Sequence, residues 1–163
     1  MTEVLSNITE ATALVIGGEA GIRRREGDEL VRTAGTPVAM RQMVKERILI
    51  GEGLAGLAAE KEEAVFSSDI VKDKRSIKEE VARADLKRSA ASLSVPLLLE
   101  SRVVGIFSIF LEQHHEFTKD ELQLAKSLAD QAAVAIENAR LYQVTEERGK
   151  RLATLVEVAQ RLT

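Results

Sequence analysis

Two aspartates, Asp69 and Asp73, lie four residues apart in a polar stretch and are the first candidates for chemistry. Paired carboxylates can act as a general acid and a general base when an acceptor, an oxyanion donor or a metal lies nearby. The sequence around them offers none of these. We therefore expect the two side chains to cap their own loop or to hydrogen-bond a ligand, and not to catalyse a reaction.

His114 and His115 are the only histidines of the chain and suggest a haem or metal ligand. Adjacent residues at a strand end point to opposite faces, so the two imidazoles cannot easily share one ion. We expect a surface turn here, and neither a haem nor a metal. The sequence contains no cysteine, which excludes disulfides, thiolate ligands and thiol catalysis.

Gly51, Gly53 and Gly56 have the Gly-x-Gly-x-x-Gly spacing of a dinucleotide-binding turn. That turn requires a strand directly before it, within a strand–helix–strand unit, and a later acidic residue for the ribose. Residues 48–50 are a short candidate for the strand, but the following chain does not alternate between strands and helices. We favour a tight turn that leads into a short helix over a nucleotide site.

Arg23, Arg24 and Arg25 suggest a nucleic-acid contact, but they belong to a predicted hairpin in which neighbouring residues face opposite sides. Three acidic residues follow within four positions. The whole chain has a net charge of -3 and a pI of about 5.6, so it has no basic surplus for a phosphate backbone. We expect a solvated strand and no nucleic-acid partner.

The strongest local pattern is a pair of apolar runs, residues 91–99 and 102–111, joined by Glu100 and Ser101. This pattern predicts an antiparallel hairpin at the centre of a sheet. Alternation predicts one apolar face formed by Leu93, Val95, Leu97, Phe107, Ile109 and Leu111. The other face carries Ser92, Ser94, Pro96, Ile106, Ser108 and Phe110. Such a mixture is typical of a pocket with a few polar groups, although the hydroxyls could equally bond backbone or water.

Helical spacing is found near both ends of the chain. Residues 1–17 form one predicted helix, and residues 76–87 form a narrow amphipathic one that includes Ile77, Val81 and Ala84. A capping box of Thr118 and Glu121 begins a helix that continues to the end. Its seam of mostly small residues predicts a dimer interface of Leu122, Ala125, Ala129, Ala132, Ile136 and Ala139. Beyond Leu141 the apolar stripe changes phase, which predicts a stutter or bend near Gly149.

The length of 163 residues fits one domain with an appendage. The longest apolar stretch, residues 95–99, is far shorter than the roughly 20 residues of a membrane helix, and the N-terminus has no signal pattern. We expect a cytoplasmic protein with no membrane partner.

Taken together, these patterns resemble the GAF domain family. The resemblance depends on the order and spacing of several pieces, since any one of them would be a weak motif. The pieces are residues 51–56 (GEGLAG), 69–70, 73–75, 92–97 (SLSVPL), 103–105, 117–122 and 128–142.

The resemblance implies an α+β fold of the GAF and PAS type, with about six antiparallel strands, terminal helices on one face and a ligand pocket on the other. The domain would span residues 1–142, with an N-terminal helix 1–17, a sheet core 20–111 and a C-terminal helix from 118. Residues 143–163 would be a helical linker. The expected pocket residues are Phe66, Asp69, Ile70, Asp73, Ser92, Ser94, Ile106, Ser108 and Phe110.

Members of this family are typically regulatory domains of sensor kinases, cyclic-dinucleotide enzymes and transcription regulators, often dimeric through their terminal helices. We therefore expect a non-enzymatic sensor of an unknown small molecule in a signal-transduction protein such as a sensor histidine kinase. It would form a homodimer and a coiled coil, with an output domain after residue 163. The alternative is a ligand-free dimerisation spacer.

Departures from the family pattern narrow the ligand. Without cysteine, the chain can neither attach a bilin covalently nor carry out the chemistry of the free-methionine sulfoxide reductases of this fold. The Asn-Lys pair typical of cyclic-nucleotide binders is missing, and Phe117 precedes Asp120 and Glu121 at a different spacing. The cofactor and ligand are left open.

Overall fold

The computed structural model describes residues 2–83 and 90–162. Within them, one six-stranded antiparallel sheet has the strand order β3-β2-β1-β6-β5-β4. The strands are β1 (Glu19–Glu26), β2 (Glu29–Gly35), β3 (Arg47–Leu49), β4 (Val65–Ser67), β5 (Ala91–Leu99) and β6 (Arg102–Leu111).

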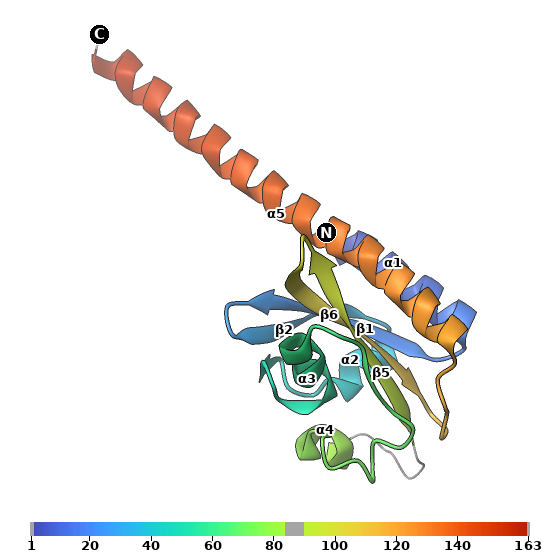
Figure 1. The fold of residues 1–163 in the computed structure, drawn as a ribbon. Coiled ribbons are helices and arrows are strands. Elements are labelled where there is room, and N and C mark those ends of the chain that lie inside the picture. The colour runs from blue at the N-terminus through green and yellow to red at the C-terminus, as the bar shows by residue number, and fades with distance from the viewer. Residues whose placement is uncertain (1, 84–89, 163) are drawn as a thin grey trace.

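Helices cover both faces of this sheet (Figure 1). The terminal helices α1 (Thr2–Ile16) and α5 (Lys119–Leu162) lie side by side on one face. Three short helices lie on the other side: α2 (Pro37–Gln42), α3 (Gly53–Lys61) and α4 (Lys78–Arg83). The predicted α+β architecture is therefore confirmed.

The β5–β6 hairpin forms as predicted. Glu100 and Ser101 have φ values of 50° and 64°, as a two-residue turn needs if it is to match the twist of its strands. Leu93 pairs with Ile109 and Val95 with Phe107. These partners share the apolar face that the alternation predicts.

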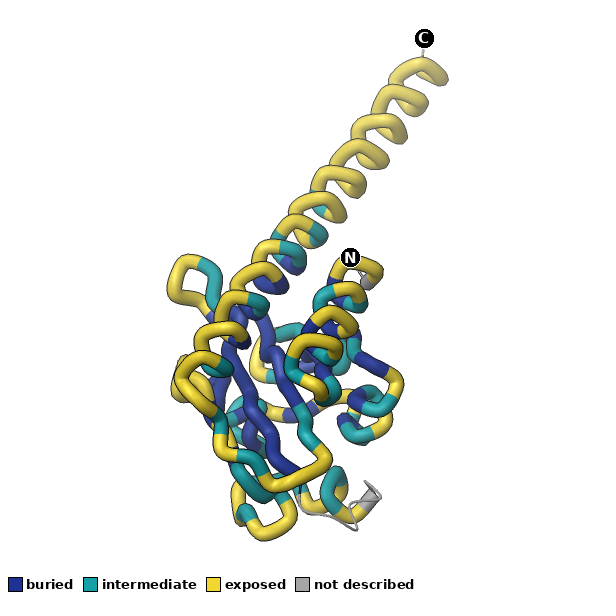
Figure 2. The backbone as a smooth tube through the Cα atoms, turned by 90° about the vertical axis from the view of Figure 1, so that its right-hand side faces the viewer, coloured by how far each residue is buried: buried dark blue, intermediate teal, exposed yellow. Residues whose placement is uncertain are grey.

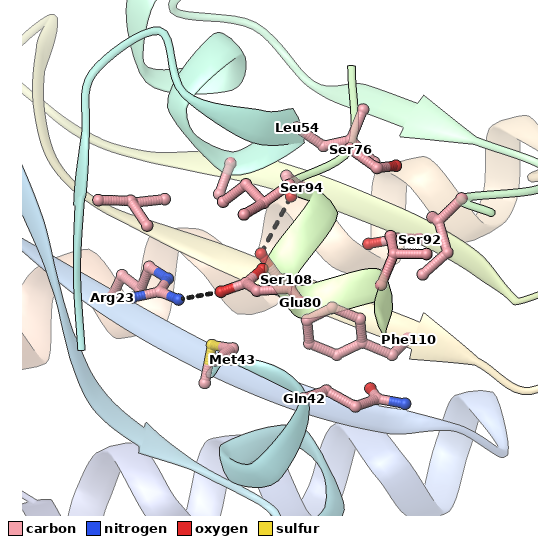
Figure 3. A pocket seen from close by; sticks show the side chains of 15 residues that line it. Arg23, Gln42, Met43, Leu54, Ser76, Glu80, Ser92, Ser94, Ser108 and Phe110 are labelled. Atoms are coloured by element: carbon pink, nitrogen blue, oxygen red, sulfur yellow. Dashed lines mark hydrogen bonds and ion pairs between the residues drawn. The ribbon is translucent and has the colours of Figure 1, made fainter. Parts of the chain in front are cut away.

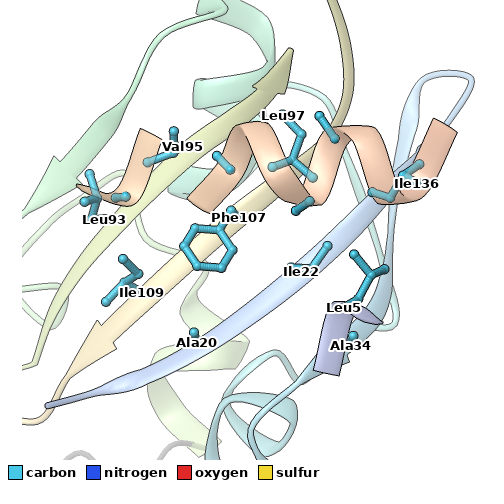
Figure 4. Packing of buried hydrophobic residues seen from close by; sticks show 14 residues of the cluster. Leu5, Ala20, Ile22, Ala34, Leu93, Val95, Leu97, Phe107, Ile109 and Ile136 are labelled. Atoms are coloured by element: carbon cyan, nitrogen blue, oxygen red, sulfur yellow. The ribbon is translucent and has the colours of Figure 1, made fainter. Parts of the chain in front are cut away.

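The main core lies between that face and the terminal helices (Figure 4). Phe107, Leu97 and Ile22 are fully buried there, and Leu5 of α1 closes the core at one side. Burying side chains of this size stabilises the fold by about 1.5–3 kcal/mol each. A second cluster, which contains Leu30, Ile48, Leu54 and Ile106, lies between the sheet and α3.

The predicted capping box begins α5. The Glu121 N–H donates to the Thr118 Oγ1 at 3.2 Å, and the Thr118 N–H donates to the Glu121 Oε1 at 3.0 Å. Each side chain thus satisfies a backbone donor of the first helical turn.

The small-residue seam of α5 does not form a dimer interface as predicted. Ala125, Ala129, Ala132 and Ile136 are at most 5% exposed because they pack on the protein's own sheet. Leu122 and Ala139 are partly buried beside them. The assignment to a dimer interface is wrong for the four buried residues, since small side chains allow a helix to approach a sheet as closely as another helix.

The C-terminal part of α5 projects beyond the domain as an arm (Figure 2). The helix is continuous from Lys119 to Leu162, so the change of phase in the apolar stripe does not interrupt it at Gly149. From Thr145 to Leu162 every described side chain is exposed.

Residues 36–50, which the sequence leaves unassigned, contain α2 and β3. The helix predicted for residues 76–87 begins at Lys78, and its end from residue 84, with the expected apolar Ala84, lies outside the described residues.

The glycine-rich turn has a packing role. β3 pairs with β2 at one edge of the sheet, whereas α3 leads to β4 at the other edge, so no strand–helix–strand unit forms. A Cβ at Gly56 would lie 2.6 Å from the Leu49 carbonyl oxygen, and one at Gly53 would lie 2.7 Å from the Ile77 Cγ1. These contacts explain the glycines without a nucleotide.

None of the helices within the described residues is both long and apolar enough to span a bilayer.

The packing of α5 predicts the effect of a charge within the seam. Ala129→Glu places an unpaired carboxylate in the core and should lower the free energy of unfolding by about 3–5 kcal/mol. Gln131→Glu adds the same charge at an exposed neighbouring position and should change it by less than about 0.5 kcal/mol. Urea unfolding followed by circular dichroism measures both. Equal stability of the two variants would contradict the packing of α5 on the sheet.

Candidate ligand pocket

A cavity of about 60 Å³ lies between the serine-bearing face of the sheet and helices α2, α3 and α4 (Figure 3). Its wall is mostly apolar and comes from segments far apart in the sequence. The apolar lining consists of Met43, Ile48, Leu54, Ala55, Ile70, Ile77, Val81 and Phe110. The polar lining consists of Arg23, Gln42, Ser76, Glu80, Ser92, Ser94 and Ser108.

Two of the serines bond to each other across the strands. Ser94 of β5 and Ser108 of β6 are register partners, and their Oγ atoms are 3.0 Å apart. Both side chains are buried, so each hydroxyl relies on the other within the protein.

An ion pair joins the sheet to α4 across the pocket. The Arg23 Nη2 of β1 donates to the Glu80 Oε1 at 2.8 Å, and Arg23 is only 3% exposed. Its Nη1 donates to the carbonyl oxygens of Lys45 and Glu46 at 2.7 and 3.2 Å. The prediction that this strand is solvated is therefore wrong at Arg23. Alternation directs Ile22 into the main core and the next residue, Arg23, to the other face of the sheet, which lines the pocket.

Burial dominates the electrostatics of this pair. Loss of solvation raises the pKa of the Glu80 carboxyl, although the Arg23 charge and the Lys45 N–H favour its ionised form. Loss of solvation also lowers the pKa of the Arg23 guanidinium, with Glu80 opposing the effect and Arg32 adding to it. Both shifts mean that the attraction between the partners does not fully offset their desolvation.

Two further polar atoms of the lining have no hydrogen-bond partner in the protein. They are the Gln42 Oε1 and the Ser76 Oγ, both buried. Buried polar atoms are nearly always hydrogen-bonded, because an unpaired one costs about 1–3 kcal/mol. These two atoms are therefore positions at which a water molecule or a ligand inside the cavity could form a hydrogen bond.

The structure brings together five of the nine predicted pocket residues: Ile70, Ser92, Ser94, Ser108 and Phe110. Ile106 lies on the same face of the sheet, but it is fully buried in the second core cluster and does not line the cavity.

Phe66 lies on the opposite face, so its predicted place in the pocket is wrong. It pairs with Leu93 in register and therefore shares the side of the terminal helices. There it is 48% exposed, with its ring 6.2 Å from that of Phe117.

Asp69 and Asp73 do not line the cavity either, and they hold their own loop. The Asp69 carboxylate accepts from the Val71 N–H at 3.1 Å. The Asp73 Oδ1 accepts from the Arg75 Nε at 2.9 Å, and this guanidinium holds the pKa of Asp73 well below its usual range. Arg75 also donates to the Phe66 carbonyl oxygen at 2.9 Å. Of the two expected roles, the loop cap is the one these contacts provide.

The predicted pocket did not include ten of the lining residues: Arg23, Gln42, Met43, Ile48, Leu54, Ala55, Ser76, Ile77, Glu80 and Val81. For two of them a signal was present. Arg23 follows Ile22 on a strand, so one of the two must face the pocket side. Glu80 is three residues after Ile77 and therefore shares its helix face. No local pattern marks Gln42 or Met43.

The histidines form no metal site with their neighbours. His115 Nε2 lies 2.8 Å from the Glu121 Oε2, and its ring lies edge-on to Phe117 at 5.1 Å. His114 is exposed. The described residues contain no group of three His, Asp or Glu side chains that could hold a metal ion.

Comparison with known proteins identifies the family. The GAF domain family matches residues 1–137, which is most of the chain. This chain therefore belongs to the GAF domain family. No curated protein matches its sequence significantly.

Solved structures share the fold. The GAF domain of a phosphoenolpyruvate-protein phosphotransferase from Coxiella burnetii has a TM-score of 0.75 and 22% identity, over 88% of this chain and 86% of that one. A domain assigned to a two-component sensor histidine kinase of Sinorhizobium meliloti 1021 has a TM-score of 0.68 and 17% identity, over 90% and 97%. A type II free methionine-R-sulfoxide reductase from Thermoplasma acidophilum has a TM-score of 0.67 and 18% identity, over 83% and 94%.

The raised pKa of Glu80 predicts a pH-dependent effect of Glu80→Gln on stability. As pH rises above about 4.3, the unfolded chain releases this proton before the folded chain does. Folding is therefore penalised in the wild type, and the penalty reaches its full size above the raised folded pKa. Relative to the wild type, Glu80→Gln should therefore have a larger free energy of unfolding at pH 7 than at pH 4.

Urea unfolding at both pH values measures this difference. Glu79→Gln, at an exposed position of the same helix, controls for the loss of one negative charge. If the relative stability of Glu80→Gln instead falls as pH rises, the attraction to Arg23 outweighs burial.

Proposed function

We propose that this GAF domain is a regulatory module that binds a small molecule in the pocket and passes its binding state to α5. The observation that carries the proposal is the pair of unpartnered polar atoms, Gln42 Oε1 and Ser76 Oγ, in a largely apolar cavity. A ligand that hydrogen-bonds to them would give both atoms a partner that the protein itself does not supply.

The sheet offers a direct route from the pocket to the terminal helices. Ser108 of the pocket is flanked along β6 by Phe107 and Ile109, which belong to the core cluster that α5 completes. Any movement of β6 at the pocket therefore changes the surface on which Ala129 and Ile136 pack. A ligand can shift α5 between two positions on the sheet only if it binds the two corresponding forms of the domain with different affinity.

A role without catalysis is part of this proposal. Reductases of this fold depend on cysteine, and this chain has none. Asp69 and Asp73, the carboxylates first considered for catalysis, are engaged in loop contacts outside the cavity.

The proposed setting is a cytoplasmic signal-transduction protein such as a sensor histidine kinase, with an output domain after residue 163. The likeness to the Sinorhizobium meliloti domain supports this setting. So does the arm of α5, whose residues 143–162 extend for about 30 Å and make no contact with the core clusters.

Ligand binding is tested by a thermal-shift screen of the purified chain against metabolite, nucleotide and tetrapyrrole libraries. A ligand at 100 times its Kd adds about 2.7 kcal/mol, which raises Tm by several degrees. Ala55→Leu, which places a larger side chain on the pocket wall, should remove that rise. Ala64→Leu, at an exposed position outside this pocket, should retain it. The absence of any hit, together with a pocket filled by side chains in a crystal structure, would contradict ligand sensing.

A second candidate function is a dimerisation spacer that binds no ligand. An apolar groove between α1 and α5 favours it, lined in part by Val4, Ile8, Leu128, Val134 and Tyr142. Exposed Val134, Leu141, Leu155 and Leu162 continue this surface along the arm at multiples of seven residues. A seven-residue period occurs in coiled-coil seams, although Arg148 occupies the intervening position of this series, and it supports a homodimer contact on this surface instead of on the buried alanines.

The dimer is tested with a charge on this seam. Leu155→Glu should turn a dimer into a monomer without loss of domain stability, because residue 155 is exposed and distant from the core. Ala153→Glu adds the same charge about 160° away around the helix and should leave the dimer intact. Sedimentation equilibrium measures both variants. A wild-type chain that stays monomeric at high concentration would refute the dimer and the spacer role together.

A further inference from the structure

The pocket already holds one carboxylate, that of Glu80. We propose that Glu80 occupies the place of a ligand's carboxylate, and that Arg23 is the group that binds a small organic acid when α4 moves away. This inference rests on the proposed function, since it names the class of ligand for the same pocket.

Arg23 is prepared to bind an anion without Glu80. The carbonyl oxygens of Lys45 and Glu46 hold its Nη1 at 2.7 and 3.2 Å, while its Nη2 points to Glu80. The two carbonyls belong to the segment between α2 and β3, not to α4. These bonds can keep the guanidinium in position when Glu80 leaves, and its Nη2 can then donate to a new carboxylate.

Glu80 is a replaceable partner for Arg23. It is carried by α4, a helix of six residues, and it contributes the acidic half of the only ion pair that joins this helix to the rest of the described chain. Exchange for a ligand carboxylate preserves the charge balance beside Arg23. The exchange also returns Glu80 to water, which relieves the burial that raises its pKa.

The rest of the lining restricts the ligand to an organic acid. Arg23 and Glu80 are the charged residues of the pocket lining, so the site offers one positive charge once Glu80 has left. One positive charge balances a monocarboxylate, whereas a doubly charged phosphate would leave one negative charge unpaired in the pocket. Ile48, Leu54 and Phe110 provide walls for a short hydrocarbon body. Gln42 or Ser76 can bond one further polar group.

The size of the cavity makes ligand binding and the release of α4 a single event. A volume of about 60 Å³ holds a few water molecules, whereas sites for drug-sized ligands measure about 300–1,000 Å³. Departure of the Glu80 side chain would enlarge this volume beside Arg23, so we expect the acid to enter by exchange with Glu80. The ligand-free domain is thus closed by its own carboxylate, and the ligand opens it by competition.

The test measures binding of isovalerate to the full chain by titration of backbone amide resonances. Isovaleramide has the same shape without the charge, and inorganic phosphate controls for other anions. Glu80→Ala removes the competing carboxylate, while Glu79→Ala makes the same change at the exposed neighbouring position of α4.

We expect isovalerate to bind Glu80→Ala at least about tenfold more tightly than it binds the wild type or Glu79→Ala, because self-occupancy lowers the competent fraction of the pocket. Isovaleramide and phosphate should not share this gain. Adding Arg23→Met to Glu80→Ala should abolish it. If that double variant does not fold, the comparison of isovalerate with isovaleramide on Glu80→Ala decides the role of charge.

If Glu79→Ala and Glu80→Ala bind isovalerate with equal affinity, Glu80 does not compete with the ligand. If Glu80→Ala binds isovaleramide or phosphate as tightly as isovalerate, the pocket is not selective for an organic acid. If isovalerate binds neither variant but neutral library compounds stabilise the wild type, this inference fails and the proposed sensing function stands. If neither isovalerate nor any library compound binds, both fail.

Discussion

The structure depends on one constraint, the alternation of side chains along the three central strands. On β1, on β5 and on β6 from Ile106 onward, every second residue faces the terminal helices and the others face the small helices. Ile22 next to Arg23, and Phe107 next to Ser108, show the result: an apolar core on one side and a pocket that contains polar groups on the other. A shift of one residue in register would exchange the two faces and destroy both.

This constraint explains how much could be predicted from the sequence. The hairpin, its two faces and the capping box at Thr118 depend on local patterns, and the structure has all three. The alanine seam of α5 was misassigned because a stripe of small residues shows close packing but not its partner. Small side chains at positions such as Ala129 are expected whether the helix packs on a sheet of its own chain or on a helix of a second chain. In this structure Ala129 and Ile136 pack on the sheet.

The missed half of the pocket has a different cause. Arg23, Gln42 and Glu80 come from separate elements, and Arg23 meets Glu80 across 57 positions of sequence. No periodicity connects them, because their meeting depends on where α2 and α4 lie over the sheet. Phe66 shows the converse, since it is close in sequence to the pocket loop but its strand register turns it away. Closeness in sequence to the pocket loop therefore did not predict on which face of the sheet Phe66 lies, because strand pairing determines that face.

The unbroken course of α5 has a mechanical consequence. A continuous helix transmits a tilt without absorbing it, whereas a hinge at Gly149 would have decoupled its two parts. From Ala139 to Leu162 the rod is about 35 Å long, so a rotation of only about 5° at the sheet sweeps its tip sideways by about 3 Å. In the proposed relay, a small displacement of the strands on which Ala129 and Ile136 pack would therefore be enlarged at the tip of the arm.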